Sequence, residues 1–105
     1  MQESIVTVLI RTQLNPDSIE QGIQDLQDLA REVRRTEPDC LAIELAQDID
    51  SPTNVTMIEK WSSREAYEGP HMHSSHMQSF IEQSSKYFAG PPEISFCRGT
   101  QIDEE

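Results

Sequence analysis

The residue types best suited to chemistry are concentrated between Trp61 and Phe80. This stretch contains the only tryptophan, all three histidines and one of the two tyrosines. An imidazole titrates near neutral pH, so a histidine can act as a general base or bind a metal ion. Trp61, Tyr67 and Phe80 could form flat apolar walls around a ring-shaped ligand. We therefore expect any functional site to include this stretch.

The histidines allow two kinds of chemistry. His71 and His76 are candidate catalytic bases, although histidines at the start of a helix also often cap it or lie in solvent. The spacing His71-x-His73-x-x-His76 also offers three imidazoles to a metal ion, and His73 and His76 share a helix face. Apart from Glu68, no carboxylate or cysteine lies within a few positions to complete a ligand set. We expect no metal and no other cofactor.

Glu59 shares the face of a predicted strand with two other candidate site residues, Met57 and Trp61. The carboxylate could contact a substrate, or it could simply pair with Arg11 or Arg98. Five other side chains are expected to contact the substrate, although each of them could equally well pack in the core. These are Met57, Trp61, Tyr67, Met77 and Phe80.

Composition restricts the class of protein. With 105 residues the chain is expected to be one domain, 1–105, with an acidic tail at about 100–105. A formal charge of -11 disfavours nucleic acid and anionic membranes as partners. No signal peptide or membrane span is expected, so the predicted location is cytoplasmic, with Cys40 and Cys97 as free thiols.

Periodicity predicts four strands and two main helices. Alternating or β-branched patterns indicate strands at 5–10, 40–47, 55–61 and 93–99. A long helix should begin at Asn15-Pro16 and end near residue 36, because apolar residues recur there at spacings of three and four. A short helix is expected from Ser62 until Gly69-Pro70 stops it, followed by a second long helix over about 72–88.

The order strand, helix, strand, strand, helix, strand predicts an α+β fold of the ferredoxin-like split βαβ type with an antiparallel sheet. Helices would cover one face of that sheet, with the second and fourth strands at its edges. The first strand has apolar side chains on both faces, Ile5 and Leu9 on one and Val6, Val8 and Ile10 on the other. We expect a second copy of the chain to cover the remaining face, which gives a homodimer.

The segment His71-x-x-Ser74-x-His76-Met77-x-x-Phe80, after a strand that ends in Trp61, resembles the antibiotic biosynthesis monooxygenase (ABM)-like family. Its usual motif is His-x-x-Ser-Pro-His, so Ser75 stands where proline is usual, and one extra residue separates Trp61 from His71. The resemblance implies a dimeric α/β barrel. It also implies oxygenation of quinols or polyketide anthrones by members that use neither metal nor flavin.

The resemblance therefore predicts a cofactor-independent monooxygenase that acts on a quinol-like or polycyclic aromatic substrate and O₂. His76 or His71 would be the base, and the break at Gly69-Pro70 favours His76. Two alternatives remain open. The chain could be an isomerase or degradative enzyme for a small oxygenated signalling molecule, or a ligand-binding or stress-response dimer without catalysis.

Overall fold

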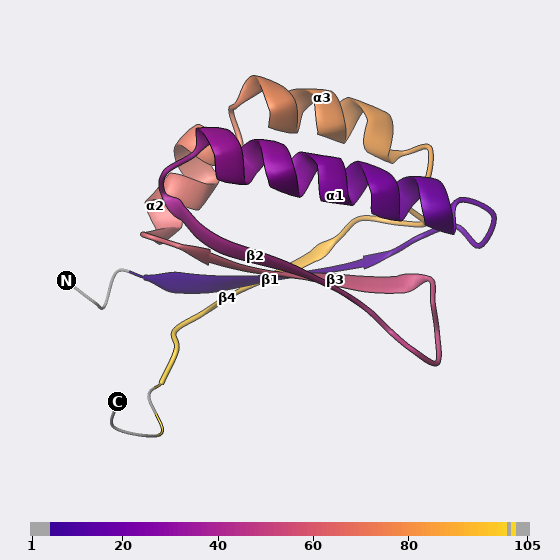
Figure 1. Ribbon diagram of the computed structural model, residues 1–105, viewed down its shortest axis with the longest axis horizontal. Helices are drawn as coiled ribbons and strands as arrows, with labels where there is room; N and C mark the ends of the chain where they lie inside the picture. Colours follow the sequence, from indigo (N-terminus) through magenta and orange to yellow (C-terminus); the bar gives the residue numbers. More distant parts are fainter. Residues whose placement is uncertain (1–4, 101, 103–105) are drawn as a thin grey trace.

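The computed structural model describes residues 5–100 and 102, and it has the predicted order of elements. Only residues 100 and 102 of the predicted acidic tail belong to the described part. The strands pair antiparallel in the order β2-β3-β1-β4, so the second and fourth strands lie at the edges as predicted. This is the predicted α+β, ferredoxin-like arrangement (Figure 1). The elements are β1 (Val6–Gln13), α1 (Ile19–Thr36), β2 (Cys40–Gln47), β3 (Asn54–Trp61), α2 (Arg64–Ala66), the π-helix η2 (Tyr67–His71), α3 (Ser75–Ser84) and β4 (Glu93–Cys97).

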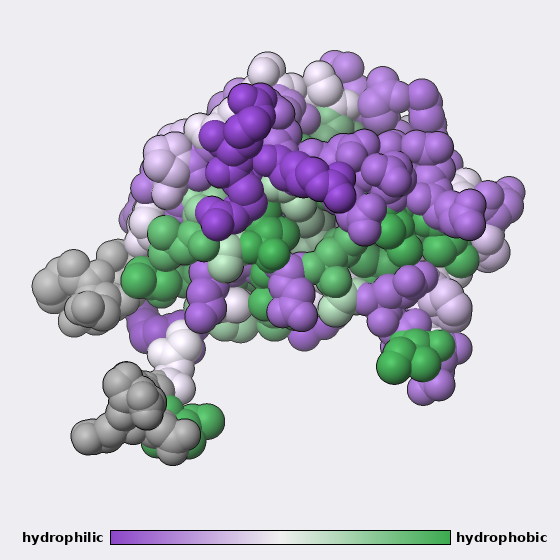
Figure 2. Space-filling model, viewed as in Figure 1, coloured by the Kyte–Doolittle hydropathy of each residue, from purple (hydrophilic) through white to green (hydrophobic). Residues whose placement is uncertain are grey.

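All helices lie on one face of the sheet, and the other face is uncovered in the single chain (Figure 1). An apolar layer, green in Figure 2, separates the polar outer surface of the helices from the sheet. Two clusters of buried residues form this core, one around Trp61 and Val33 and one around Leu26 and Tyr87. Among the helices of the described residues, none is long and apolar enough to cross a membrane.

Strand register decides which side chains reach the core. Val8 lies opposite Glu59 on β3 and opposite Phe96 on β4, so these three share the helix-covered face. On the uncovered face, Leu9 lies opposite Ile58. The predicted alternation on β2 was wrong at one residue: a β-bulge between Cys40 and Ala42 directs Cys40 into the core and leaves Leu41 exposed.

The first helix begins later than the predicted Asn15-Pro16 start. Asn15 donates its backbone N–H to the Tyr87 carbonyl, and Ser18 donates to the Asn15 carbonyl, so this segment forms a turn. Helical hydrogen bonding therefore begins at Ile19, after Ser18 as N-cap. β1 also continues beyond the predicted residue 10, to Gln13, because β3 pairs with it over that whole length.

The second long helix is shorter than predicted, since α3 covers Ser75–Ser84 rather than 72–88. At its end the Ser84 hydroxyl donates to the Ile81 carbonyl, the kind of side-chain bond that competes with continued helix. Phe88 instead forms an isolated antiparallel bridge with Leu14. β4 ends at Cys97, two residues before the predicted end.

Candidate functional site

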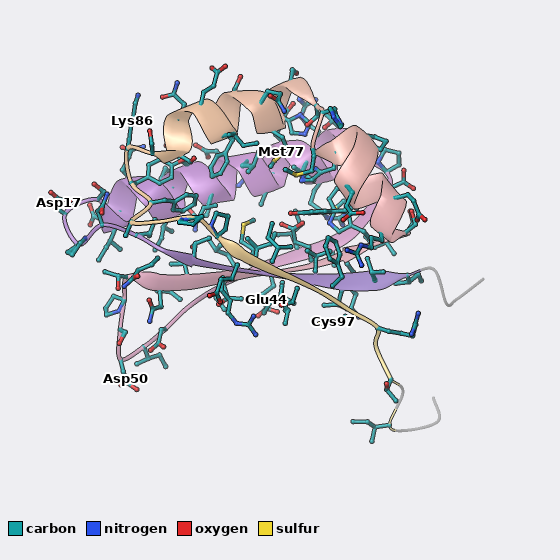
Figure 3. All side chains as sticks on the ribbon, turned by 180° about the vertical axis from the view of Figure 1, so that it is seen from behind. Asp17, Glu44, Asp50, Met77, Lys86 and Cys97 are labelled. Atoms are coloured by element: carbon teal, nitrogen blue, oxygen red, sulfur yellow. The ribbon has the colours of Figure 1, made fainter. Side chains whose placement is uncertain are left out.

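A cavity of about 230 Å³ lies between the sheet and the helices. Its walls are mainly apolar side chains of α1, α3 and the sheet, and they include three predicted site residues, Met57, Met77 and Phe80. Figure 3 shows Met77 on the sheet side of α3. Polar groups are few: Glu59, Tyr67, His71, Thr12 and Ser84. The Thr12 hydroxyl already donates to the Val55 carbonyl. The side chains that can exchange a proton with a ligand are therefore Glu59, Tyr67 and His71.

The π-helix η2 places two of these groups. Tyr67 and His71 are its first and last residues, and both are buried and line the cavity. A π-turn holds one more residue than an α-turn, so it accommodates the extra residue between Trp61 and His71. The predicted stop at Gly69-Pro70 was therefore wrong: Pro70 lies within η2. Its missing N–H removes one helical hydrogen bond, as at other widened turns.

The start of α3 explains the departure at Ser75. Ser74 is the N-cap, and its hydroxyl accepts a hydrogen bond from the Met77 N–H at 3.3 Å. Ser75 is consequently the first helical residue, the position at which proline is favoured but not required. Serine in place of the usual proline thus leaves the helix start intact, and His76 follows on the first turn.

Glu59 is an almost completely buried acid on the cavity wall, with 4% of its surface exposed. Arg11, one predicted alternative partner, lies on the opposite face of the sheet, and no ion pair with Arg11 or Arg98 is found for Glu59 among the described residues. Instead, Trp61 Nε1–H donates to Glu59 Oε1 at 2.8 Å. Burial raises the pKa of Glu59 from 4.5 to about 7, the Trp61 hydrogen bond lowers it in part, and the charge of Glu37 adds to the rise. The carboxyl can therefore hold or release a proton near neutral pH.

His71 is the buried imidazole of the cavity, with 3% of its surface exposed. Its ring packs against Trp61 and Tyr67, with centroid distances of 4.5 and 5.0 Å. His71 Nδ1 lies 2.9 Å from Glu37 Oε2. A carboxylate only accepts, so Nδ1 carries the proton and the lone pair of the neutral ring is on Nε2. Burial lowers the pKa of His71, which Glu37 partly offsets, and the neutral basic form is favoured.

Glu37 also bonds to the second candidate base. His76 Nε2 lies 2.5 Å from the same Oε2 atom, so two imidazoles donate to one carboxylate oxygen. His76 is not among the residues that line the cavity. Of the two histidines, only His71 therefore has its side chain on the cavity wall, whereas the break at Gly69-Pro70 had favoured His76.

Glu37 was not among the predicted site residues. It is the C-cap of α1, and its backbone N–H donates to the Val33 carbonyl. A topological signal was available, because β2 begins just after this turn and Cys40 pairs with Trp61 at the same end of the sheet. In a split βαβ fold, the end of the first helix must therefore lie near the end of the third strand.

Trp61 and Tyr67 were both expected to form pocket walls, and of the two only Tyr67 lines the cavity. Trp61 is fully buried and lies behind Glu59 and His71 rather than on the cavity surface. Tyr67 does line the cavity, and its ring meets Trp61 in a T-shaped contact with centroids 5.6 Å apart. Burial raises the pKa of the Tyr67 phenol, so it remains protonated and can donate a hydrogen bond. Trp61 therefore fixes the positions of Glu59, through a hydrogen bond, and of His71, through ring packing.

The antibiotic biosynthesis monooxygenase family matches residues 5–83. A comparison with curated proteins finds no match. Among solved structures, a conserved protein from Methanosarcina mazei Go1 has a TM-score of 0.82 at 20% identity, over 94% of this chain and 96% of that one.

Two further solved structures are similar. One, from Pseudomonas aeruginosa, has a TM-score of 0.84 at 22% identity, over 96% of this chain and 99% of that one. A candidate antibiotic biosynthesis monooxygenase from Caulobacter crescentus has a TM-score of 0.85 at 19% identity, over 94% of this chain and 92% of that one. At these identities the likeness concerns the fold. The family match covers most of the sequence, and the chain belongs to the antibiotic biosynthesis monooxygenase family.

Proposed function

We propose that this protein oxygenates a small hydroquinone-like aromatic compound with O₂, using His71 as the base and neither flavin nor metal in the reaction. One observation carries the proposal: His71 lines an apolar cavity, and its Nδ1–H is held by Glu37 so that Nε2 has the lone pair. Glu59, on the same cavity wall, has a pKa of about 7. Family membership supports the reaction class.

The reaction needs a proton acceptor and an enclosure. His71 Nε2 removes a phenolic proton, and the imidazolium then lies beside the phenolate, whose charge it balances out of bulk water. The electron-rich anion reacts with O₂, and the substrate supplies all the electrons: a hydroquinone and O₂ give a hydroxyquinone and water. Protonated Glu59 or the Tyr67 phenol would donate a hydrogen bond to the oxygen at which charge develops.

The cavity size restricts the substrate. A cavity of about 150 Å³ is enough for benzene, whereas drug-sized ligands occupy about 300–1,000 Å³. At about 230 Å³, the space suits one or two fused rings better than the three or four of a polyketide anthrone. We therefore narrow the expected substrates to benzo- and naphthohydroquinones.

A second copy of the chain is part of the proposal. The uncovered face of the sheet has Leu9 opposite Ile58 at its centre, and such an apolar pair favours a covering partner. The β2–β3 loop and the segment after β4 extend on this same side (Figure 1), and they carry the exposed Ile49 and Ile102. Sedimentation of the wild type as a dimer, and of Ile58→Glu as a monomer, is expected. A monomeric wild type would contradict this part.

Oxygen uptake tests the reaction. An oxygen electrode would record initial rates with hydroquinones of one to four rings, and the proposal expects activity on one- and two-ring compounds with formation of a hydroxyquinone. Turnover under anaerobic conditions would instead indicate an isomerase. Binding of the same compounds without oxygen uptake would indicate a ligand-binding protein, and either result would overturn the proposed reaction.

A further inference from the structure

Three side chains beside the cavity, of which only His71 lines it, form a cluster that the proposed oxygenation only partly uses. Glu37 Oε2, His71 Nδ1 and His76 Nε2 all lie within 4.8 Å of one another. They come from three separate elements: the end of α1, η2 and the first turn of α3. Among the described residues, only these two imidazoles lie within ion-pair distance of Glu37. In the described part of the chain, this largely enclosed carboxylate has no ion pair with a lysine or arginine.

We propose that Glu37, His71 and His76 bind a divalent transition-metal ion of the Zn²⁺ type. Imidazole nitrogens suit Zn²⁺ and its first-row neighbours, whereas Mg²⁺ and Ca²⁺ prefer oxygen ligands throughout. Two nitrogens and one carboxylate oxygen make a three-ligand set, which leaves a position for water or another small ligand.

The distances agree with this ligand set after a small adjustment. Tetrahedral bonds of about 2.0–2.1 Å to each ligand separate the ligand atoms by about 3.3 Å. The two oxygen-to-nitrogen distances are 2.9 and 2.5 Å, so each must lengthen by less than about 1 Å, and the two nitrogens, which lie within 4.8 Å of each other, must approach by at most about 1.5 Å. As the ion takes the place of the two N–H protons that now point at the carboxylate, each neutral ring carries its proton on the other nitrogen instead, Nε2 of His71 and Nδ1 of His76.

Burial favours a defined site with a route for the ion. The side chain of His71 is enclosed, and its ring orientation is fixed by packing against Trp61 and Tyr67. His76 and Glu37 remain 18% and 14% exposed, so an ion and a water ligand can reach them from solvent. His73, which the sequence spacing grouped with the other two histidines, is excluded, because its Nδ1 bonds to the Gly69 carbonyl at 2.8 Å.

Metal binding would affect the reaction. An ion on His71 Nδ1 leaves the ring proton on Nε2, so the imidazole can no longer accept a phenolic proton. Zn²⁺ should therefore inhibit oxygen uptake. This consequence rests on the proposed function, whereas the binding itself does not.

Direct binding to the purified full-length chain tests the inference. After removal of adventitious ions, Zn²⁺ would be titrated in competition with a chromophoric chelator, and Co²⁺ would report coordination by its visible absorption. The wild type should bind one ion per chain, His76→Ala and Glu37→Gln should each bind about 100-fold more weakly, and Mg²⁺ should not compete. His73→Ala is the matched control and should bind like the wild type.

The result that would overturn the inference is wild-type binding no tighter than that of His76→Ala, or a loss in His73→Ala as large as in the other variants. Glu37→Gln keeps nearly the same shape, so it decides the question if His76→Ala fails to fold. The inhibitory consequence has its own check: loss of oxygen uptake on chelation, restored by one particular ion, would contradict it. Metal binding without any oxygen uptake would leave this inference standing and refute only the proposed function.

Discussion

Replacing Glu59 by glutamine should remove a pH-dependent loss of stability that the wild type has between about pH 4.5 and 7. The pKa of Glu59 is raised from 4.5 to about 7 by burial. In that window the folded protein keeps the proton that the unfolded chain has released, so stability falls as pH rises and levels off above the folded pKa. A difference of that size corresponds to roughly 3 kcal/mol.

Urea unfolding at about pH 5 and about pH 8 measures this effect. The gain in unfolding free energy of Glu59→Gln over the wild type should be small at the lower pH and should approach roughly 3 kcal/mol at the higher pH. Glutamine retains an oxygen that can accept the Trp61 N–H, so that hydrogen bond is kept. Glu44→Gln is the matched control, because Glu44 lies on the uncovered face of the same sheet (Figure 3) and should show no such difference.

Trp61 offers an independent readout as the only tryptophan, bonded to Glu59 Oε1. Its fluorescence in the wild type should change with a midpoint near pH 7, and that transition should be absent in Glu59→Gln. An equal stability gain at both pH values, together with an unchanged fluorescence titration, would refute a buried, proton-holding Glu59.

Three further predictions concern packing and the π-helix. Tyr87→Phe should raise the free energy of unfolding by about 1 kcal/mol, because the buried Tyr87 hydroxyl has no hydrogen-bond partner among the described residues; urea unfolding would contradict this if the variant were less stable. Gly22→Ala should lower the free energy of unfolding by about 1 kcal/mol, although alanine has the better helix propensity, because the new Cβ would lie 2.6 Å from Cδ2 of the buried Leu14. A higher melting temperature than that of the wild type would show instead that Leu14 moves aside. Deleting Gly69 should convert η2 to an α-turn and rotate His71 away from the cavity. Oxygen uptake should then be lost, while the far-ultraviolet circular dichroism spectrum stays like that of the wild type. Retained oxygen uptake would contradict the role given to the π-turn.

Periodicity predicted the strands and helices, because side-chain alternation and helical spacing are set by backbone geometry, and the order of these elements predicted the second and fourth strands at the edges of the sheet. The periodic pattern gave the wrong prediction where a local contact determined the conformation of the backbone. The exposure of Leu41 was not predicted, because strand alternation does not reveal a β-bulge. The helix was started at Asn15 because the pattern of cap and proline does not show that Asn15 bonds to distant Tyr87.

The candidate site was predicted in part. The stretch around Trp61 and His71 was identified from residue types, and both residues do lie together at one end of the core. Glu37 was missed because it is distant in sequence and reaches His71 only through the fold. The π-helix was missed because Gly-Pro usually ends a helix, and a widened turn differs from a break only in hydrogen bonding that the sequence does not encode separately.

The most direct test of the account compares initial rates of oxygen uptake for His71→Ala and His73→Ala with the best hydroquinone substrate. The two histidines are two positions apart, but His71 lines the cavity whereas His73 is exposed and bonds to the Gly69 carbonyl. Loss of a general base should lower the rate of His71→Ala by about 10²–10⁴-fold and leave His73→Ala near the wild-type rate. Equal rates in the two variants would contradict the assignment of His71 as the base.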